Sequence, residues 1–142
     1  MRRWLGTAAV IAGLALAAHL GGQTKETPKA ADTAVKVIEV TAKQFEYAPE
    51  EIRVKKGTRV QLKVRATDRT HGFKLSLYPD GTPADGPPGL KFDQPQDNWK
   101  LEKDQERIIE FVAERAGTYP FKCSVFCGLG HSRMNGKLIV EE

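Results

Sequence analysis

The chain has 142 residues and a formal net charge of +4, to which Arg2 and Arg3 contribute two of the positive charges. Acidic and basic residues are interspersed, with no Lys/Arg run and no interleaving of aromatic and basic side chains, so we do not expect a nucleic acid partner. The Gly-x4-Gly-Lys phosphate loop and the Gly-x-Ser-x-Gly motif are also absent from the sequence, which therefore carries neither of these two enzyme signatures.

The N-terminal segment predicts export. Arg2 and Arg3 precede an apolar run over residues 4–20, and a positive start followed by a short apolar stretch and small residues is typical of a signal peptide. The alternative is an uncleaved membrane anchor, for which the run has close to the minimum length. We therefore expect residues 1–22 to be a signal peptide or an anchor that tethers the protein through residues 4–20. In either case the rest of the chain is predicted to be periplasmic or otherwise extracytoplasmic.

The residues that follow divide into a linker and one domain. Residues 23–33 are mainly Lys, Thr, Ala, Gln and Pro with little apolar content, which predicts a flexible linker. Residues 34–142 have the length of a single domain.

This domain is predicted to consist of strands. Apolar and polar residues alternate over residues 60–65, 71–77, 109–113 and 119–123, and shorter apolar segments occupy residues 35–40, 52–54 and 138–140. A period of two indicates strands with one buried face, and short strands at this spacing predict an all-β fold, an antiparallel β-sandwich. Residues 78–101 are rich in Pro and Gly and show no periodicity, so we expect a long loop there, of a kind that is often functional.

Four metal-binding side chains lie in one short segment near the C-terminus. Their spacing is Cys-x3-Cys-x3-His-x2-Met, and they are Cys123, Cys127, His131 and Met134. The chain has no other Cys, and its only other Met is the initiator. Thiolate, thioether and imidazole together suit copper, especially Cu(I), far better than magnesium or calcium. Because His19 lies in the N-terminal apolar run, His71 is the remaining imidazole of the predicted domain.

Other readings of these residues remain open. Cys123 and Cys127 are compatible with a disulfide, since an exported chain meets an oxidising compartment. A mononuclear blue-copper site uses one Cys, two His and a Met, which Cys127, His71, His131 and Met134 can supply without Cys123. Zinc accepts two Cys and two His, although the methionine argues against it.

The pattern resembles the cupredoxins, and among them the CuA domains of cytochrome c oxidase subunit II and nitrous oxide reductase. Those domains share the Cys-x3-Cys-x3-His-x2-Met spacing and an upstream His. The resemblance runs from about residue 35 onward and includes Gly117-Thr-Tyr119-x-Phe121-x-Cys123 before the motif and Gly136-Lys-Leu138-Ile-Val140 after it. It implies a Greek-key β-sandwich with two coppers per chain. By this resemblance Cys123 and Cys127 would bridge the coppers, His71 and His131 would each cap one, and Met134 and the backbone carbonyl of Val125 would be weak ligands.

A metal centre whose ligand positions are all filled by protein has no open position for a substrate, so it favours electron transfer over substrate chemistry. The same difference separates structural zinc sites, which are closed, from catalytic zinc sites, which keep an open position. We therefore expect a non-enzymatic electron-transfer protein whose redox partner is a cytochrome c or a terminal reductase or oxidase. A copper storage or delivery protein and an oxidase subunit II-like component are the alternatives, because the same ligands serve all three. Phe126 and Leu129 are expected to pack around the metal and shield it. The end of the sandwich that carries His131 and Leu129 is expected to be the docking face.

Asp68, three residues before His71, has two readings: a turn residue or a hydrogen-bond partner of that histidine.

Overall fold

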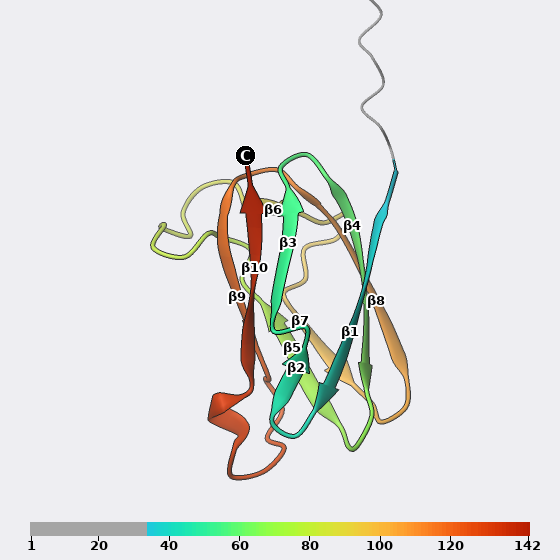
Figure 1. Cartoon of the computed structure of the whole chain (residues 1–142). Helices are drawn as coiled ribbons and strands as arrows, with labels where there is room; N and C mark the ends of the chain where they lie inside the picture. The colour runs from blue at the N-terminus through green and yellow to red at the C-terminus, as the bar shows by residue number, and fades with distance from the viewer. Residues whose placement is uncertain (1–33) are drawn as a thin grey trace, which may run out of the picture. The chain divides into compact units, whose positions relative to one another are not determined.

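The computed structural model describes residues 34–142, and the predicted signal peptide or anchor and the predicted linker lie outside the described residues. Within residues 34–142 the fold is all-β, as predicted, and the strands form two five-stranded sheets (Figure 1). Among the described residues, no helix has the length and apolar character needed to cross a membrane.

The first sheet has the order β2-β1-β4-β8-β6. Its strands are β1 (Lys36–Lys43), β2 (Glu46–Ala48), β4 (Arg59–Ala66), β6 (Leu90–Lys91) and β8 (Glu106–Ala113). The second sheet has the order β3-β10-β9-β5-β7. Its strands are β3 (Glu51–Lys55), β5 (His71–Leu75), β7 (Asn98–Leu101), β9 (Gly117–Lys122) and β10 (Asn135–Glu141), and a short 3-10 helix, η1 (His131–Arg133), precedes β10.

The β-sandwich is confirmed, but its sheets are mixed and not wholly antiparallel. Strands β1 and β4 pair in parallel in one sheet, and β3 and β10 pair in parallel in the other, while the remaining pairs are antiparallel. The reason lies in the connection between β1 and β4. The chain leaves the first sheet after β2, forms β3 in the second sheet, and then returns beside β1 in the same direction.

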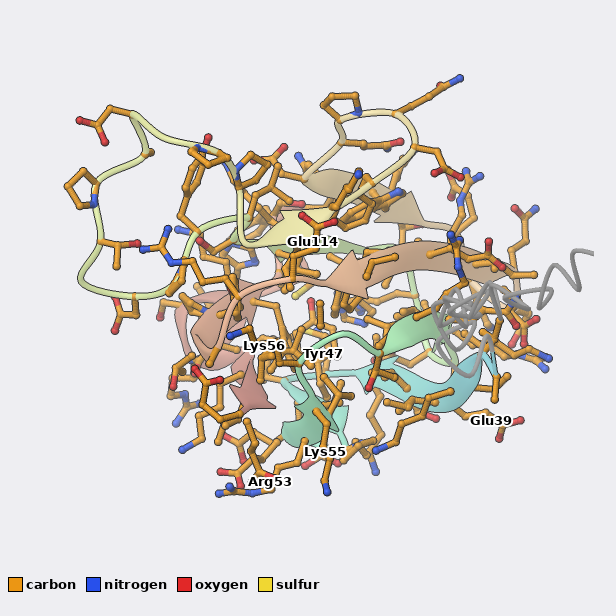
Figure 2. The ribbon with its side chains drawn as sticks, turned by 90° about the horizontal axis from the view of Figure 1, so that it is seen from above. Glu39, Tyr47, Arg53, Lys55, Lys56 and Glu114 are labelled. Carbon is orange, nitrogen blue, oxygen red and sulfur yellow. The ribbon has the colours of Figure 1, made fainter. Side chains whose placement is uncertain are left out.

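The core lies between the two sheets and follows from the alternation in the sequence. Val60, Leu62 and Val64 on β4 are fully buried, and the residues between them are partly exposed. The same alternation turns Ile52 and Val54 of β3 inward, whereas Arg53 and Lys55 are exposed. Figure 2 shows these two basic side chains on the outside of the sandwich and Tyr47 between the sheets. Burial of one face per strand therefore holds the sheets together.

The segment over residues 78–101 is more ordered than the expected loop. It contains β6 and β7, and β7 pairs with β5 at the edge of the second sheet, with Trp99 opposite Phe73 and Leu101 opposite His71. Only two apolar residues of β7 turn inward, because the strand has four residues. Such a short alternation, close after a run of Pro and Gly, is too weak a pattern to indicate a strand.

Three connections meet at one end of the sandwich. The turn between β1 and β2, the loop between β4 and β5, and the long connection between β9 and β10 lie together at the lower end in Figure 1. Segments that are far apart in the sequence therefore supply one site.

Candidate metal centre

His71 is the first residue of β5, and its imidazole is completely buried. It shares the inward face of the strand with Phe73 and Leu75, as the alternation predicts. Its Nδ1 atom lies 3.9 Å from Cys123 Sγ, and its Nε2 atom lies 2.7 Å from Asp68 Oδ1. The ring thus has one nitrogen toward a thiol and the other held by a carboxylate.

Cys123 follows directly after β9 and continues its inward face after Tyr119 and Phe121. The backbone N–H of Cys123 donates to the Met134 carbonyl at 3.0 Å, which closes the segment between them into a loop. Cys127 lies within this loop, and both thiols are buried and free, with their Sγ atoms 3.8 Å apart. The structure therefore does not contain the disulfide that was one alternative.

The other predicted ligands surround the two thiols. His131 Nδ1 and Met134 Sδ each lie 3.8 Å from Cys127 Sγ, and the Cys123 thiol donates to the Val125 carbonyl at 3.1 Å. The ligand atoms of His71, Cys123 and Cys127 are all within 4.8 Å of one another, and His131 lies outside this set of three. All six predicted positions come together, with the two imidazoles beside different sulfurs.

A glycine allows the close approach between β5 and the loop. A Cβ atom on Gly72 would collide with Ser124 Oγ and would lie 2.7 Å from the Ser124 backbone nitrogen, so no larger residue fits. The N–H of Gly72 is directed at Cys123 Sγ at 3.4 Å, and its carbonyl accepts a hydrogen bond from Tyr47 Oη at 2.5 Å. Burial raises the pKa of Tyr47, which therefore remains a neutral donor beside the thiols.

Two side chains outside the predicted ligand set hold the loop at Cys127. Gln44 Nε2 and Arg69 Nη1 both donate to the carbonyl oxygen of Cys127, at 2.5 Å and 3.0 Å. Gln44 lies between β1 and β2, and Arg69 lies between β4 and β5. They are 83 and 58 residues from Cys127 in the sequence, so no local pattern could have indicated these contacts.

Asp68 links several of these groups. Besides facing His71, its carboxylate accepts the backbone N–H groups of Gln44 at 2.9 Å and Arg69 at 2.8 Å. Partial burial opposes ionisation of this carboxyl group. The hydrogen bonds from Gln44, His71 and Arg69 outweigh that burial and hold the pKa of Asp68 below its usual value.

The thiol of Cys127 is held in its neutral form. Burial, followed by the hydrogen bond and charge of Cys123, raises the pKa of the Cys127 thiol to about 11. Without a cation, two adjacent buried thiolates would be strongly disfavoured. A bound metal ion supplies the positive charge that offsets this cost, and so the thiol pair is suited to a metal ion.

The expectation for Phe126 and Leu129 is wrong. Phe126 is 74% exposed and Leu129 is 99% exposed, so neither covers the thiols. The position under the loop is taken instead by Phe45, whose ring lies where a side chain on Gly130 would project. The Phe126 ring lies beside the His131 ring, with the centroids 6.0 Å apart, so this exposed ring forms an apolar surface next to that imidazole, and the exposed Leu129 belongs to the same loop.

The donor set fits copper. Two thiols, a thioether and two imidazoles converge within the sandwich, and soft sulfur donors combined with imidazole select copper over hard cations. The fold and this donor set define a cupredoxin-like protein. The profile of the cupredoxin-like domain family matches residues 8–140, and the chain belongs to this family.

Sequence relatives are found among oxidase subunits. Cytochrome c oxidase subunit 2 of Thermus thermophilus is 28% identical over 103 residues, which make up 72% of this chain and 64% of that protein. A second subunit 2 sequence from the same species is equally similar and is covered to 51%. The chain therefore spans less than two thirds of the length of these relatives.

Solved structures share the fold. Auracyanin A, a "blue" copper protein of Chloroflexus aurantiacus, superposes with a TM-score of 0.56 at 20% identity, over 76% of this chain and 100% of that one. The periplasmic domain of subunit II of cytochrome oxidase from Bradyrhizobium japonicum also gives 0.56, at 18% identity, over 75% of this chain and 84% of that one. At these identities the likeness concerns the fold alone.

Proposed function

We propose that this chain is an extracytoplasmic electron-transfer protein with a dinuclear, CuA-type copper centre. One observation carries the proposal: two free thiols lie 3.8 Å apart, and each faces a different imidazole. The residues that would hold two coppers are His71, Cys123, Val125 through its carbonyl, Cys127, His131 and Met134.

The thiol pair suits metal ions that both sulfurs share. Sulfurs 3.8 Å apart can both bind the same ion at about 2.3 Å. The two imidazoles lie beside different sulfurs, so the chain would supply ligands for two ions and not only for one. A mononuclear site with Cys127 would instead place both imidazoles beside that one sulfur, but His71 faces Cys123.

The closed surroundings support electron transfer and not catalysis. His71 is fully buried, the two Cys residues are 2–3% exposed, and protein atoms occupy the sides of the donor cluster. Copper held by these residues would supply one-electron chemistry. Buried ligands held by a rigid sandwich also argue against a copper storage or delivery site, whose ion must leave readily.

Location and partners are part of the proposal. We place residues 1–22 as a signal peptide or anchor, residues 23–33 as a linker and residues 34–142 as the copper domain in the periplasm. The redox partner would be a cytochrome c or a terminal reductase or oxidase. The 28% identity to a cytochrome c oxidase subunit 2 favours, as a second candidate, a role as an oxidase subunit II-like component.

The deciding experiment measures copper per chain and the EPR spectrum of the purified, copper-loaded protein. We expect two coppers and a hyperfine pattern from one unpaired electron delocalised over both. Cys123→Ser should abolish this spectrum, and Ser124→Ala, at the exposed neighbouring position, should leave it unchanged. One copper per chain that survives in Cys123→Ser would establish the mononuclear alternative.

A further inference from the structure

Arg69 and Gln44 reach the same backbone oxygen from different loops. Their side chains donate to the Cys127 carbonyl, and among the described residues no backbone N–H bonds to that oxygen. The internal backbone bonds of the loop use the carbonyls of Gly128, Gly130 and His131 instead. Because an unpaired carbonyl in a partly buried place is costly, these two side chains replace the partner that the loop itself lacks.

The charge of Arg69 is available to this site. Among residues 34–142 its guanidinium makes no ion pair, whereas Arg53 and Arg65 each face a carboxylate. Guanidinium groups stay protonated at every working pH. Arg69 therefore brings a fixed positive charge to the main chain of Cys127, where it acts on the thiol pair together with the opposite charge of the neighbouring Asp68 carboxylate.

Arg69 also connects the two halves of the centre. It is adjacent to Asp68, whose carboxylate binds the ring of His71 and the backbone N–H groups of both Gln44 and Arg69. The loop between β4 and β5 thus holds His71 through one residue and Cys127 through the next. The early histidine and the late ligand loop are placed relative to each other by this network of side chains, in addition to the sandwich itself.

We propose that Arg69, together with Gln44, is a positioning residue of the centre: it fixes the ligand loop at Cys127 and raises the reduction potential of copper bound there. The second effect follows from Coulomb's law, because a positive charge near the site stabilises the state that has gained an electron. The role in tuning copper rests on the proposed function, whereas the role in fixing the loop does not. Gln44 supplies a hydrogen bond without charge, so it shares only the first role.

The test separates charge from hydrogen bonding. Arg69→Gln removes the charge, Arg69→Lys keeps it without the planar fork, and Gln44→Ala removes the neutral donor. Arg65→Gln is the matched control, because Arg65 is an exposed arginine of β4 whose nearest acid is Asp104 at 3.9 Å. For each variant we would measure the midpoint potential of the copper-loaded protein, its Cu(I) affinity by competition with a chelator, and amide hydrogen exchange of the copper-free protein.

Arg69→Gln should lower the midpoint potential and weaken Cu(I) binding by about 10- to 100-fold, the usual effect of losing a partner that orients a ligand. Arg69→Lys should restore most of the potential, and Gln44→Ala should weaken binding with a smaller change in potential. In the copper-free protein, Arg69→Gln should speed exchange of the Cys123 and His131 amides, which close the loop. Arg65→Gln should change none of these quantities.

Equal potentials and affinities in Arg69→Gln and Arg65→Gln would overturn the tuning role, and equal exchange rates would overturn the positioning role. If the wild-type protein bound no copper, the proposed function would fail, while faster loop exchange in Arg69→Gln would still support positioning.

Discussion

The Oδ1 atom of Asp68 lies 2.7 Å from Nε2 of His71, while Nδ1 of the same ring faces the sulfur of Cys123 at 3.9 Å. A carboxylate that accepts a hydrogen bond from Nε2–H orients the ring so that Nδ1 is directed into the donor cluster. Of the two readings that the sequence allowed for Asp68, the hydrogen-bond partner of His71 is therefore the one that the structure contains.

Replacing Asp68 should weaken copper binding without removing a ligand. In Asp68→Ala the imidazole loses its orienting partner, and the affinity for copper should fall by about 10- to 100-fold. Asp85→Ala, in the exposed connection before β6, is the control and should bind copper as the wild type does. Competition titration with a Cu(I) chelator measures both. Equal affinities in the two variants would show that the sandwich alone orients His71.

The alternating segments were sufficient to predict the buried faces. Val60, Leu62 and Val64, and likewise Tyr119 and Phe121, are buried as their period of two indicates. Which strands become neighbours depends on contacts between distant segments, so the parallel pairing of β1 with β4 was not readable from local patterns. The three-residue β2 and the four-residue β7 are too short for a period to be recognised.

In the site, too, local sequence patterns were informative, whereas contacts between distant segments could not be predicted. The convergence of the proposed ligand residues was predictable because their residue types are rare in this chain and lie at informative spacings. The contacts of Gln44 and Arg69 with Cys127 were not predictable, since both residue types are common on surfaces and the partner is a backbone atom. The exposure of Phe126 and Leu129 was missed because apolar character suggested burial, whereas the loop turns both side chains toward solvent.

Met134 and His131 should differ in their effect on the centre. The thioether is expected to be a weak ligand that tunes potential, and Leu has nearly the same volume in this buried position. Met134→Leu should therefore keep copper and shift the midpoint potential, whereas His131→Ala should lose copper or change the EPR spectrum. Metal analysis and potentiometry on both variants test this ranking. Complete loss of copper in Met134→Leu would reverse it.

Copper affinity should rise with pH through the neutral range. The pKa of Cys127, raised to about 11 by burial and by Cys123, keeps the thiol protonated there, so binding must release its proton. Each released proton increases the apparent affinity about tenfold per pH unit below that pKa. Competition titrations at several pH values between about 6 and 8 measure the slope, in the range where proteins ordinarily work. An affinity independent of pH would mean that this thiol does not lose its proton on binding.

The stabilising contribution of Asp68 should disappear in acid. Its folded pKa is held below the ordinary value, so the ionised form stabilises the fold above about pH 4 and this contribution is lost as pH falls through the folded pKa. The difference in unfolding free energy between the wild type and Asp68→Ala should therefore be constant near neutrality and shrink below about pH 4. Denaturant titrations of the copper-free proteins provide the measurement. If this difference in unfolding free energy stayed constant into acid, Asp68 would stabilise the fold through packing and not through its charge.

Electron exchange should take place through the apolar surface beside His131. Leu129 is 99% exposed and Phe126 is 74% exposed, and the Phe126 ring lies 6.0 Å from the only ligand imidazole that is not fully buried. Transient redox complexes use small interfaces, so one charge placed in an apolar contact should weaken them strongly. Leu129→Glu should keep the copper spectrum, because its side chain is almost wholly in solvent, and should slow electron exchange with a small cytochrome c.

Val37→Glu is the matched control for this surface. Val37 is 51% exposed near the start of β1, and this strand begins at the end of the sandwich opposite the ligand loop (Figure 1). The two variants carry the same change of charge, so any general effect of an added carboxylate on association with the cytochrome c appears in both. Slower exchange in Leu129→Glu alone would assign docking to the His131 end. If the two variants exchanged electrons equally fast, docking would take place elsewhere. If the wild type exchanged none but released copper readily to an apo-oxidase, copper delivery would be the better description of the protein.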